Sequence, residues 1–421
     1  MKINSDKKQI ISWALFDFAN SPFTTLVVTF IYAAYFIKEI AGDEITGTQL
    51  WSFGVTITAI FVALLSPISG VLADICNLRK ISLFISTLIA AICTSFLYFI
   101  LPGNIYGALF FFIIANIAFE TGMIFYNAFL PEIAPPDKIG KISGFGWGLG
   151  YIGGLAALFI ALIGFIYPDV PWFSLSKEQG QNIRATNFLV AFWYILFSIP
   201  LFVFIKEQKA PKRIEFKDAI FKSMKELYNT FLEIKKYRKI FTFLLARLIY
   251  NDALITIFAF GGIYASGTFN FSYNEILIFG IVLNICAGTG AIVMGYLDDY
   301  IGGKKTIQFS IIALTIASCI AVFAPDKIYF WISGILVGIF SGPNQSASRS
   351  YMSRLIPKDR ENQFFGFYAF SGKCTAFLGP FLLGILTEFF HCQRIGISVV
   401  ILFFIVGFVI LSKVDMKKQN I

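Results

Sequence analysis

The sequence predicts an all-α integral membrane protein with twelve transmembrane helices in two pseudo-symmetric six-helix bundles. Composition, regularly spaced apolar windows and an internal repeat support this prediction. Of the 421 residues, 57% are hydrophobic and 14% charged, whereas about 25% are charged in a typical soluble domain. The mean hydropathy is +0.74, and the 50 phenylalanines suit lipid-facing and inter-helix packing. This composition excludes an ordinary soluble enzyme.

Apolar windows of about 20 residues, the length that crosses a bilayer as a helix, recur along the whole chain. The first six windows lie at 11–37, 49–72, 81–101, 105–131, 143–167 and 187–205. The second six lie at 240–266, 275–297, 306–324, 328–350, 364–387 and 395–412. We therefore expect an N-terminal bundle at 1–205, a basic amphipathic linker at 206–239 and a C-terminal bundle with a short tail at 240–421.

The positive charges indicate which side of the membrane each loop occupies. Both termini and the even-numbered loops carry 27 of the 34 Lys and Arg residues, whereas the odd-numbered loops carry five. By the positive-inside rule, both termini and the linker should be cytoplasmic. The net charge of +9 then reports topology and requires no nucleic-acid partner. The segment after MKINSDKKQ contains no small-residue cleavage site, so we expect no cleaved signal peptide.

The two halves repeat a loop motif. GVLADICNLRK (70–80) aligns without gaps with GYLDDYIGGKK (295–305), and PPDKIGKISGF (135–145) aligns with PKDRENQFFGF (357–367). The shared positions of the first pair are Gly70/Gly295, Asp74/Asp299, Arg79/Lys304 and Lys80/Lys305. Parallel repeats of this kind are typical of transporters in which two bundles rock about a central site.

Each residue of the loop motif has a physical use. The glycines let neighbouring helices approach closely, and the aspartates can cap the N-terminus of a helix in the other bundle. The cations can pair with acids on adjacent helix ends. Because such contacts must break when this side opens, they would bias a two-state equilibrium. The alternative is that these are ordinary short loops with cations reaching the membrane surface.

The repeated loop and the twelve-window layout resemble the major facilitator superfamily over essentially the whole chain. In that superfamily the loop stabilises the outward-facing state. The glycine-rich segment GFGWGLGYIGG (144–154) resembles the superfamily's fifth helix, without its usual Gly-Pro step, and its GxxxG spacings favour close packing. Within the superfamily, WALFDFANSPF (13–23), 247–269 and 344–380 resemble the autophagy-related vacuolar effluxer-like branch. That branch contains fungal vacuolar amino-acid effluxers and bacterial members of unknown substrate.

Polar residues inside the windows are the candidate cavity residues, because ionisable groups in a membrane usually face a cavity and mark a substrate or proton path. In the superfamily the first, fourth, seventh and tenth helices line this cavity, and all of the candidates except Lys373 lie on them. The candidates are Asp17, Asn20, Ser21, Glu120, Asn127, Arg247, Asn251, Asp252, Asn344, Gln345 and Lys373.

The charges among these candidates suggest roles. Acidic and basic groups in one cavity would suit a zwitterionic substrate, and Glu120 is our first choice for proton coupling because no cation lies near it in sequence. Asp17 is expected to be a cavity or inner-gate residue. Alternatively, the charges form structural pairs, for example Arg247 with Asp17 or Asp252. Pro22 is expected to interrupt the first helix.

Two further arginines complete the predicted gate. Arg349 and Arg354 lie near the inner end of the tenth window and are expected to form an inner gate with Asp359 or Glu361. Plain anchoring by the positive-inside rule is the alternative.

The sequence therefore favours a secondary transporter of a small polar solute such as an amino acid, with protons as a possible co-substrate. The alternatives are a lipid or drug exporter, a membrane transferase, and a receptor or scaffold with a transporter fold. Six scattered cysteines and one histidine, His391, give no metal or disulfide pattern, and we expect no cofactor and no enzyme activity. We expect a monomer in the lipid bilayer of a bacterial inner membrane. Substrate, direction and energy coupling stay open.

Overall fold

The computed structural model describes residues 7–207, 214, 216–233 and 235–414. Every regular element in these ranges is a helix. Eleven helical segments are long and apolar enough to cross a membrane. The predicted all-α membrane fold is confirmed.

The first half of the chain folds into six long helical segments. Their elements are α1 (Lys7–Pro22), η1 (Phe23–Phe30), α2 (Tyr32–Tyr35), η2 (Phe36–Ile40), α3 (Glu44–Cys76), α4 (Arg79–Phe96), η3 (Leu97–Phe99), α5 (Ile105–Ala128), α6 (Leu130–Ile133), α7 (Ile139–Ala161), η4 (Leu162–Ile166), η5 (Trp172–Ser174), η6 (Glu178–Gly180) and α8 (Gln181–Phe204).

The linker and the second half follow the same plan. Their elements are α9 (Phe216–Leu232), α10 (Arg238–Phe269), α11 (Tyr273–Ile301), α12 (Gly303–Phe323), α13 (Lys327–Leu355), α14 (Glu361–Lys373), α15 (Leu378–Phe390), α16 (Gln393–Ile397) and α17 (Val399–Ser412).

The predicted tenth span, at 328–350, is α13. It is 29 residues long and therefore about 43 Å from end to end, which exceeds the thickness of a membrane core. It is absent from the eleven apolar segments because its second half, SGPNQSASRSYMSR, is polar. Those polar residues are mostly buried against other helices, so their composition reflects contacts inside the protein.

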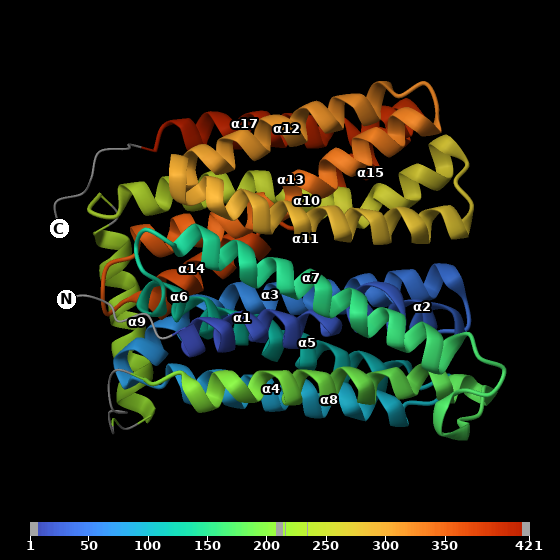
Figure 1. Ribbon diagram of the computed structural model, residues 1–421, viewed down its shortest axis with the longest axis horizontal. Coiled ribbons are helices and arrows are strands. Elements are labelled where there is room, and N and C mark those ends of the chain that lie inside the picture. The colour runs from blue at the N-terminus through green and yellow to red at the C-terminus, as the bar shows by residue number, and fades with distance from the viewer. Residues whose placement is uncertain (1–6, 208–213, 215, 234, 415–421) are drawn as a thin grey trace.

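The long helices lie side by side, with the first half in the lower part of Figure 1 and most of the second half in the upper part. Helices α11 and α13 pack against α7 of the first half, and α14 packs against α3 and α5. Helix α9 crosses the left end of the molecule, where α1 begins and α17 ends. We call this the motif end, since the loops 70–80 and 295–305 lie there, and the opposite end the far end. The exact domain boundaries stay a prediction.

The first span changes its helical form at Pro22, as predicted. The α-helical part ends at this residue, and Phe23–Phe30 continues as a π-helix. A proline lacks the backbone N–H that an α-helix uses and clashes with the preceding turn. The change occurs near the middle of the 34-residue span.

Candidate functional site

The first loop motif joins α3 to α14. Asp74, near the end of α3, accepts hydrogen bonds from the backbone N–H groups of Asn362 (3.2 Å) and Gln363 (2.7 Å) at the start of α14. A Cβ atom on Gly70 would overlap the carbonyl oxygen of Asn362. The predicted cap and the predicted close approach are therefore both present.

The second loop motif makes the equivalent contact between α11 and α7. Asp299 accepts hydrogen bonds from the backbone N–H groups of Gly140 (2.7 Å) and Lys141 (2.8 Å) at the start of α7. Gly295 lies against the backbone of Gly140, and a Cβ there would be 2.9 Å from its carbonyl oxygen. The two contacts involve equivalent positions of the repeated loop, and they join the two halves at the motif end.

The cations of the loops behave differently from one another. Arg79 pairs with Glu132 at 2.6 Å and with Glu361 at 3.4 Å, as expected for a pairing with acids. The ammonium groups of Lys80 and Lys304 instead donate to backbone carbonyls, of Ile205 (2.7 Å) and of Ser412 (3.0 Å) and Val414 (2.6 Å), respectively. Lys305 is exposed. The prediction of an acidic partner was wrong for the Lys80 ammonium, and the long side chains of Lys80 and Lys304 cap the ends of neighbouring helices.

Arg354 does not meet Asp359 or Glu361, so that prediction was wrong. Its guanidinium reaches Asp298 at 2.5 Å and Asp299 at 2.7 Å, and Ser350 also hydrogen-bonds Asp298. The arginine points back along α13 toward α11 and so supports the carboxylate that caps α7.

Arg349 forms a buried ion pair with Asp17. The guanidinium Nη1 lies 2.9 Å from the Asp17 carboxylate, and the two side chains are only 2% and 8% exposed. Its Nε and Nη2 donate to the hydroxyl and the carbonyl of Ser143 on α7. Nη1 is also 3.4 Å from the side-chain oxygen of Asn127. One side chain of α13 thus joins α1, α5 and α7 of the other half.

Aromatic rings surround this ion pair and form a buried layer with it. The Arg349 guanidinium lies 4.7 Å from the ring centre of Trp13, 5.7 Å from Tyr126 and 5.6 Å from Trp147. Cation–π attraction is strongest where water is excluded. Asp17 is therefore part of this buried layer. Its partner is Arg349, and the alternative pairing with Arg247 was wrong.

Arg247 lies elsewhere, over the ring of Tyr368 at 3.6 Å from its centre. It donates to the Tyr368 carbonyl at 2.7 Å and to the hydroxyl of Ser371 at 2.9 Å. The alternative pairing of Arg247 with Asp252 was also wrong. Its contacts satisfy the last turn of α14.

Glu120 and Lys373 form an ion pair between α5 and α14, with 2.6 Å between the ammonium and a carboxylate oxygen. The side chains are 21% and 31% exposed. The pair joins residues 253 positions apart, which explains why the sequence neighbourhood of Glu120 showed no cation. The argument that made Glu120 the first choice for proton coupling therefore fails.

The other predicted cavity residues are dispersed. Asn20 is buried beside the Met123 sulfur at 3.5 Å, and Asn344 donates to Ser310 at 3.0 Å. Asn251 donates to the Gly372 carbonyl at 3.3 Å. Gln345 is half-buried. These residues do not form one cluster.

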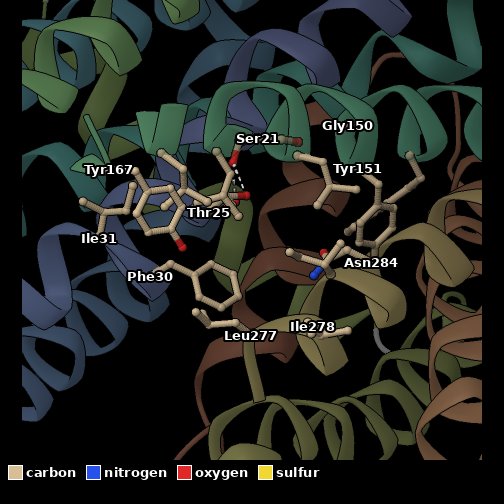
Figure 2. A pocket seen from close by; sticks show the side chains of 16 residues that line it. Ser21, Thr25, Phe30, Ile31, Gly150, Tyr151, Tyr167, Leu277, Ile278 and Asn284 are labelled. Carbon is tan, nitrogen blue, oxygen red and sulfur yellow. Dashed lines mark hydrogen bonds between the residues drawn. The ribbon is translucent and has the colours of Figure 1, made fainter. Parts of the chain in front are cut away.

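A pocket of about 430 Å³ lies between α1 with η1, α7 with η4, and α11. Figure 2 shows Ser21, Thr25, Tyr151 and Asn284 around one part of it and Phe30 with Leu277 and Ile278 around another. Ser21 is the one predicted cavity residue in its lining. Since Tyr167 and Leu162 also line it, the pocket extends toward the far end, away from the closed motif end.

Sequence reasoning missed several residues of these sites. The missed residues are Ser143, Asp298, Thr25, Tyr151 and Asn284. Two of them had a signal: Asp298 precedes the motif aspartate, and Thr25 lies eight residues after Asp17, on the same helix face as Ser21. The others lie on helices that were not expected to line the cavity.

Comparisons with known proteins agree with this architecture. The family described as "ATG22: Vacuole effluxer Atg22 like" matches residues 39–420. The "Uncharacterized MFS-type transporter YxiO" of Bacillus subtilis is 29% identical over 96% of this chain and 94% of that protein. "Autophagy-related protein 22" of Yarrowia lipolytica is 21% identical over 88% of this chain and 75% of that protein.

Among solved structures, the major facilitator superfamily transporter FucP in the outward conformation superposes with a TM-score of 0.73. The match covers 97% of this chain and 99% of FucP at 13% identity, which shows the shared fold. The family match over residues 39–420 and this shared fold lead to the same assignment for this multi-pass membrane protein. The chain belongs to the Atg22-like vacuole effluxer family of the major facilitator superfamily of membrane transporters.

Proposed function

We propose that this transporter carries a small zwitterionic solute, an amino acid, by alternating access. The observation that supports this proposal is the Glu120–Lys373 ion pair. Its two charges come from α5 in the first half and α14 in the second half, 2.6 Å apart and partly exposed. An amino acid carries the same two charges, so its carboxylate can replace Glu120 at Lys373 while its ammonium replaces Lys373 at Glu120.

Energetics favour such an exchange. A carboxylate or ammonium inside a membrane protein that loses its partner is costly, and a solute that supplies both charges leaves neither group unpaired. A singly charged solute that displaced the pair would leave one of the two groups without a partner, and a neutral solute would leave both. The pair thereby discriminates in favour of zwitterions and links solute binding to the contact between the two halves.

The closed motif end supports a specific state of the cycle. Asp74, Asp299 and Arg349 join the two halves there, whereas the pocket extends toward the far end. With the motif end in the cytoplasm, as the distribution of positive charges predicts, this is an outward-facing state of a monomeric carrier in a bacterial inner membrane. Breaking these contacts would open the cytoplasmic side.

A second candidate substrate class has its own support. The pocket walls include Phe30, Leu277 and Ile278, and apolar walls of this kind bind hydrophobic ligands. A lipid or hydrophobic drug would use this surface and would have no need of the ion pair.

Ligand-induced thermal stabilisation of the purified protein tests the proposal. At a hundred times its dissociation constant, a ligand adds about 2.7 kcal/mol to the stability of the folded state. We expect stabilisation by one or more amino acids, and its loss in Glu120→Gln and in Lys373→Met. The matched control is Lys327→Met, which removes the exposed Lys327–Glu275 pair near the far end and should leave the response intact.

Stabilisation by hydrophobic cations or lipids alone, with no amino acid active, would overturn the amino-acid proposal in favour of the second class. A response to amino acids that survives both Glu120→Gln and Lys373→Met would show that the ion pair is not the recognition site.

A further inference from the structure

The eleventh span is interrupted in its middle. Helix α14 ends at Lys373 and α15 begins at Leu378, with turns between them. An interruption inside a membrane protein exposes backbone groups that need partners, because no bulk water is present to satisfy them. We call this segment, residues 374–377, the break.

Three polar residues of α10 supply those partners. Arg247 and Asn251 donate to the carbonyls of Tyr368 (2.7 Å) and Gly372 (3.3 Å) in the last turns of α14. Asp252 accepts from the backbone N–H of Gly379 at 3.3 Å, in the first turn of α15. The donors thus meet the carbonyl end of one half-helix, and the carboxylate meets the amide end of the next.

Asp252 differs from Arg247 and Asn251 because one of its carboxylate oxygens has no hydrogen-bond partner among the described residues. It is 2% exposed, and within the described part of the chain no group hydrogen-bonds its Oδ1. Its single bond to Gly379 is long. Asp252 is 14 residues into α10, about 21 Å along the helix, so the orphaned oxygen lies deep in the bundle.

The nearby cations do not neutralise Asp252. Arg247 is engaged by Tyr368 and Ser371, and Lys373 is engaged by Glu120. Arg349 of α13 points to Asp17. The thiol of Cys374, in the break, is a titratable group that interacts electrostatically with Asp252.

The remaining helices packed against α10 bring no closer charge. Helix α17 has no titratable side chain, and Glu388 of α15 is nine residues beyond Gly379. Arg394 of α16 donates to the Val322 carbonyl. The acids of α11 near its end, Asp298 and Asp299, are paired with Arg354 at the motif end. An ionised Asp252 would therefore be a buried charge with no cationic side chain beside it and one long hydrogen bond from Gly379, which is unfavourable.

We propose that Asp252 is a reversible proton-binding site at the break, occupied by a proton while the motif end is closed. The inference rests on the proposed transport cycle. A proton fits the site better than a metal ion, because Na⁺ and similar ions need several oxygen ligands. No cluster of three His, Cys, Asp or Glu side chains exists in the described ranges.

The position of the break connects this proton to the movement of the halves. Helix α14 packs on α3 and α5 of the first half, whereas α10 packs on α17 of the second half. Helix α14 also packs on α10 of its own half, so when the halves rock apart α14 leaves α3 and α5, and water can reach the break and Asp252 from that side. Hydration then adds to the stabilisation that the positive end of α15 already gives the carboxylate, and the proton leaves.

Infrared spectroscopy of the purified protein at neutral pH tests this inference without a substrate. We expect a protonated-carboxyl C=O band that is lost in Asp252→Asn and shifted in Asp252→Glu. The matched control Glu275→Gln removes a carboxylate that is ion-paired with Lys327 near the far end and should leave the band unchanged.

A band that is identical in the wild type and Asp252→Asn would overturn the inference, as would its loss in Glu275→Gln with Asp252 intact. If Asp252→Asn fails to fold, the Asp252→Glu shift decides. The result is independent of the amino-acid proposal: absence of amino-acid stabilisation with the band present would refute the substrate class and leave the proton site standing.

Discussion

At the scale of single residues, Arg349 is the central contact of the closed motif end. It is a fully buried guanidinium that binds Asp17 and Ser143 and lies beside Trp13. Guanidinium presents several donors in a rigid fork, so one side chain can hold groups from three helices at once. A lysine could reach one of these groups but not all of them.

Replacing Arg349 should reveal this dependence. Arg349→Leu leaves the Asp17 carboxylate buried without its partner, and breaking a buried pair in this way typically costs about 3–5 kcal/mol. We expect a large fall in the thermal unfolding temperature. The double variant Arg349→Leu with Asp17→Asn removes both charges and should recover part of the loss. Equal losses in the single and double variants would show that the ion pair itself carries little of the effect.

At the scale of elements, the glycines of α7 determine how closely it lies against α1. A Cβ on Gly146, Gly150 or Gly154 would be 2.6, 2.8 or 2.5 Å, respectively, from a side-chain oxygen of the first span, formed by α1 and η1. Those oxygens belong to Asp17, Ser21 and Thr25. Because both sets recur every four residues, one glycine stripe meets one polar stripe along a shared face.

Adding a methyl group to this stripe should destabilise the protein. We expect Gly146→Ala to cost about 1–3 kcal/mol, since overpacking forces the helices apart or the side chains out of their rotamers. The matched control is Gly261→Ala on α10, where a Cβ would have no atom within 4 Å. There the better helix propensity of alanine should be neutral or slightly stabilising. Thermal unfolding of the two variants decides; equal shifts would contradict the close-packing argument.

The break between α14 and α15 shows what sequence patterns at the element scale miss. The segment 364–387 is one continuous apolar window, and it predicted one helix. Pro380 lies just after the break, but a proline in the first turn of a helix is also common. The contacts that stabilise the break come from α10, more than 100 residues earlier. Only the folded chain brings these partners together.

At the scale of the whole molecule, sequence reasoning predicted the layout better than the pairings. The repeat placed Asp74 and Asp299 opposite helix N-termini, because equivalent positions in duplicated halves must make equivalent contacts. The ion pairs Asp17–Arg349 and Glu120–Lys373 join residues 332 and 253 positions apart. Neither has a counterpart in the repeat, so charge counting found the residues without finding their partners.

The last prediction concerns the equilibrium between the two ends of the molecule. Asp74 of α3 caps α14 across the two halves, whereas Asp43 caps the start of α3 itself through the backbone N–H of Thr46. That hydrogen bond lowers the pKa of the Asp43 carboxyl. Two capping aspartates therefore lie at opposite ends of α3. Asp43 caps α3 itself, whereas Asp74 caps α14 and so contributes to the closure of the motif end.

Cys76, buried two residues after Asp74, is a native reporter of this closure. In a background that keeps only this cysteine, Asp74→Ala should speed its labelling by a maleimide, since losing a cap of about 1–2 kcal/mol raises the open population about 5- to 30-fold. Asp43→Ala should leave the labelling rate unchanged, because its cap lies at the far end of α3. Equal acceleration in both variants would mean that α3 loosens as a whole, and no acceleration in Asp74→Ala would mean that the motif-end cap does not control opening.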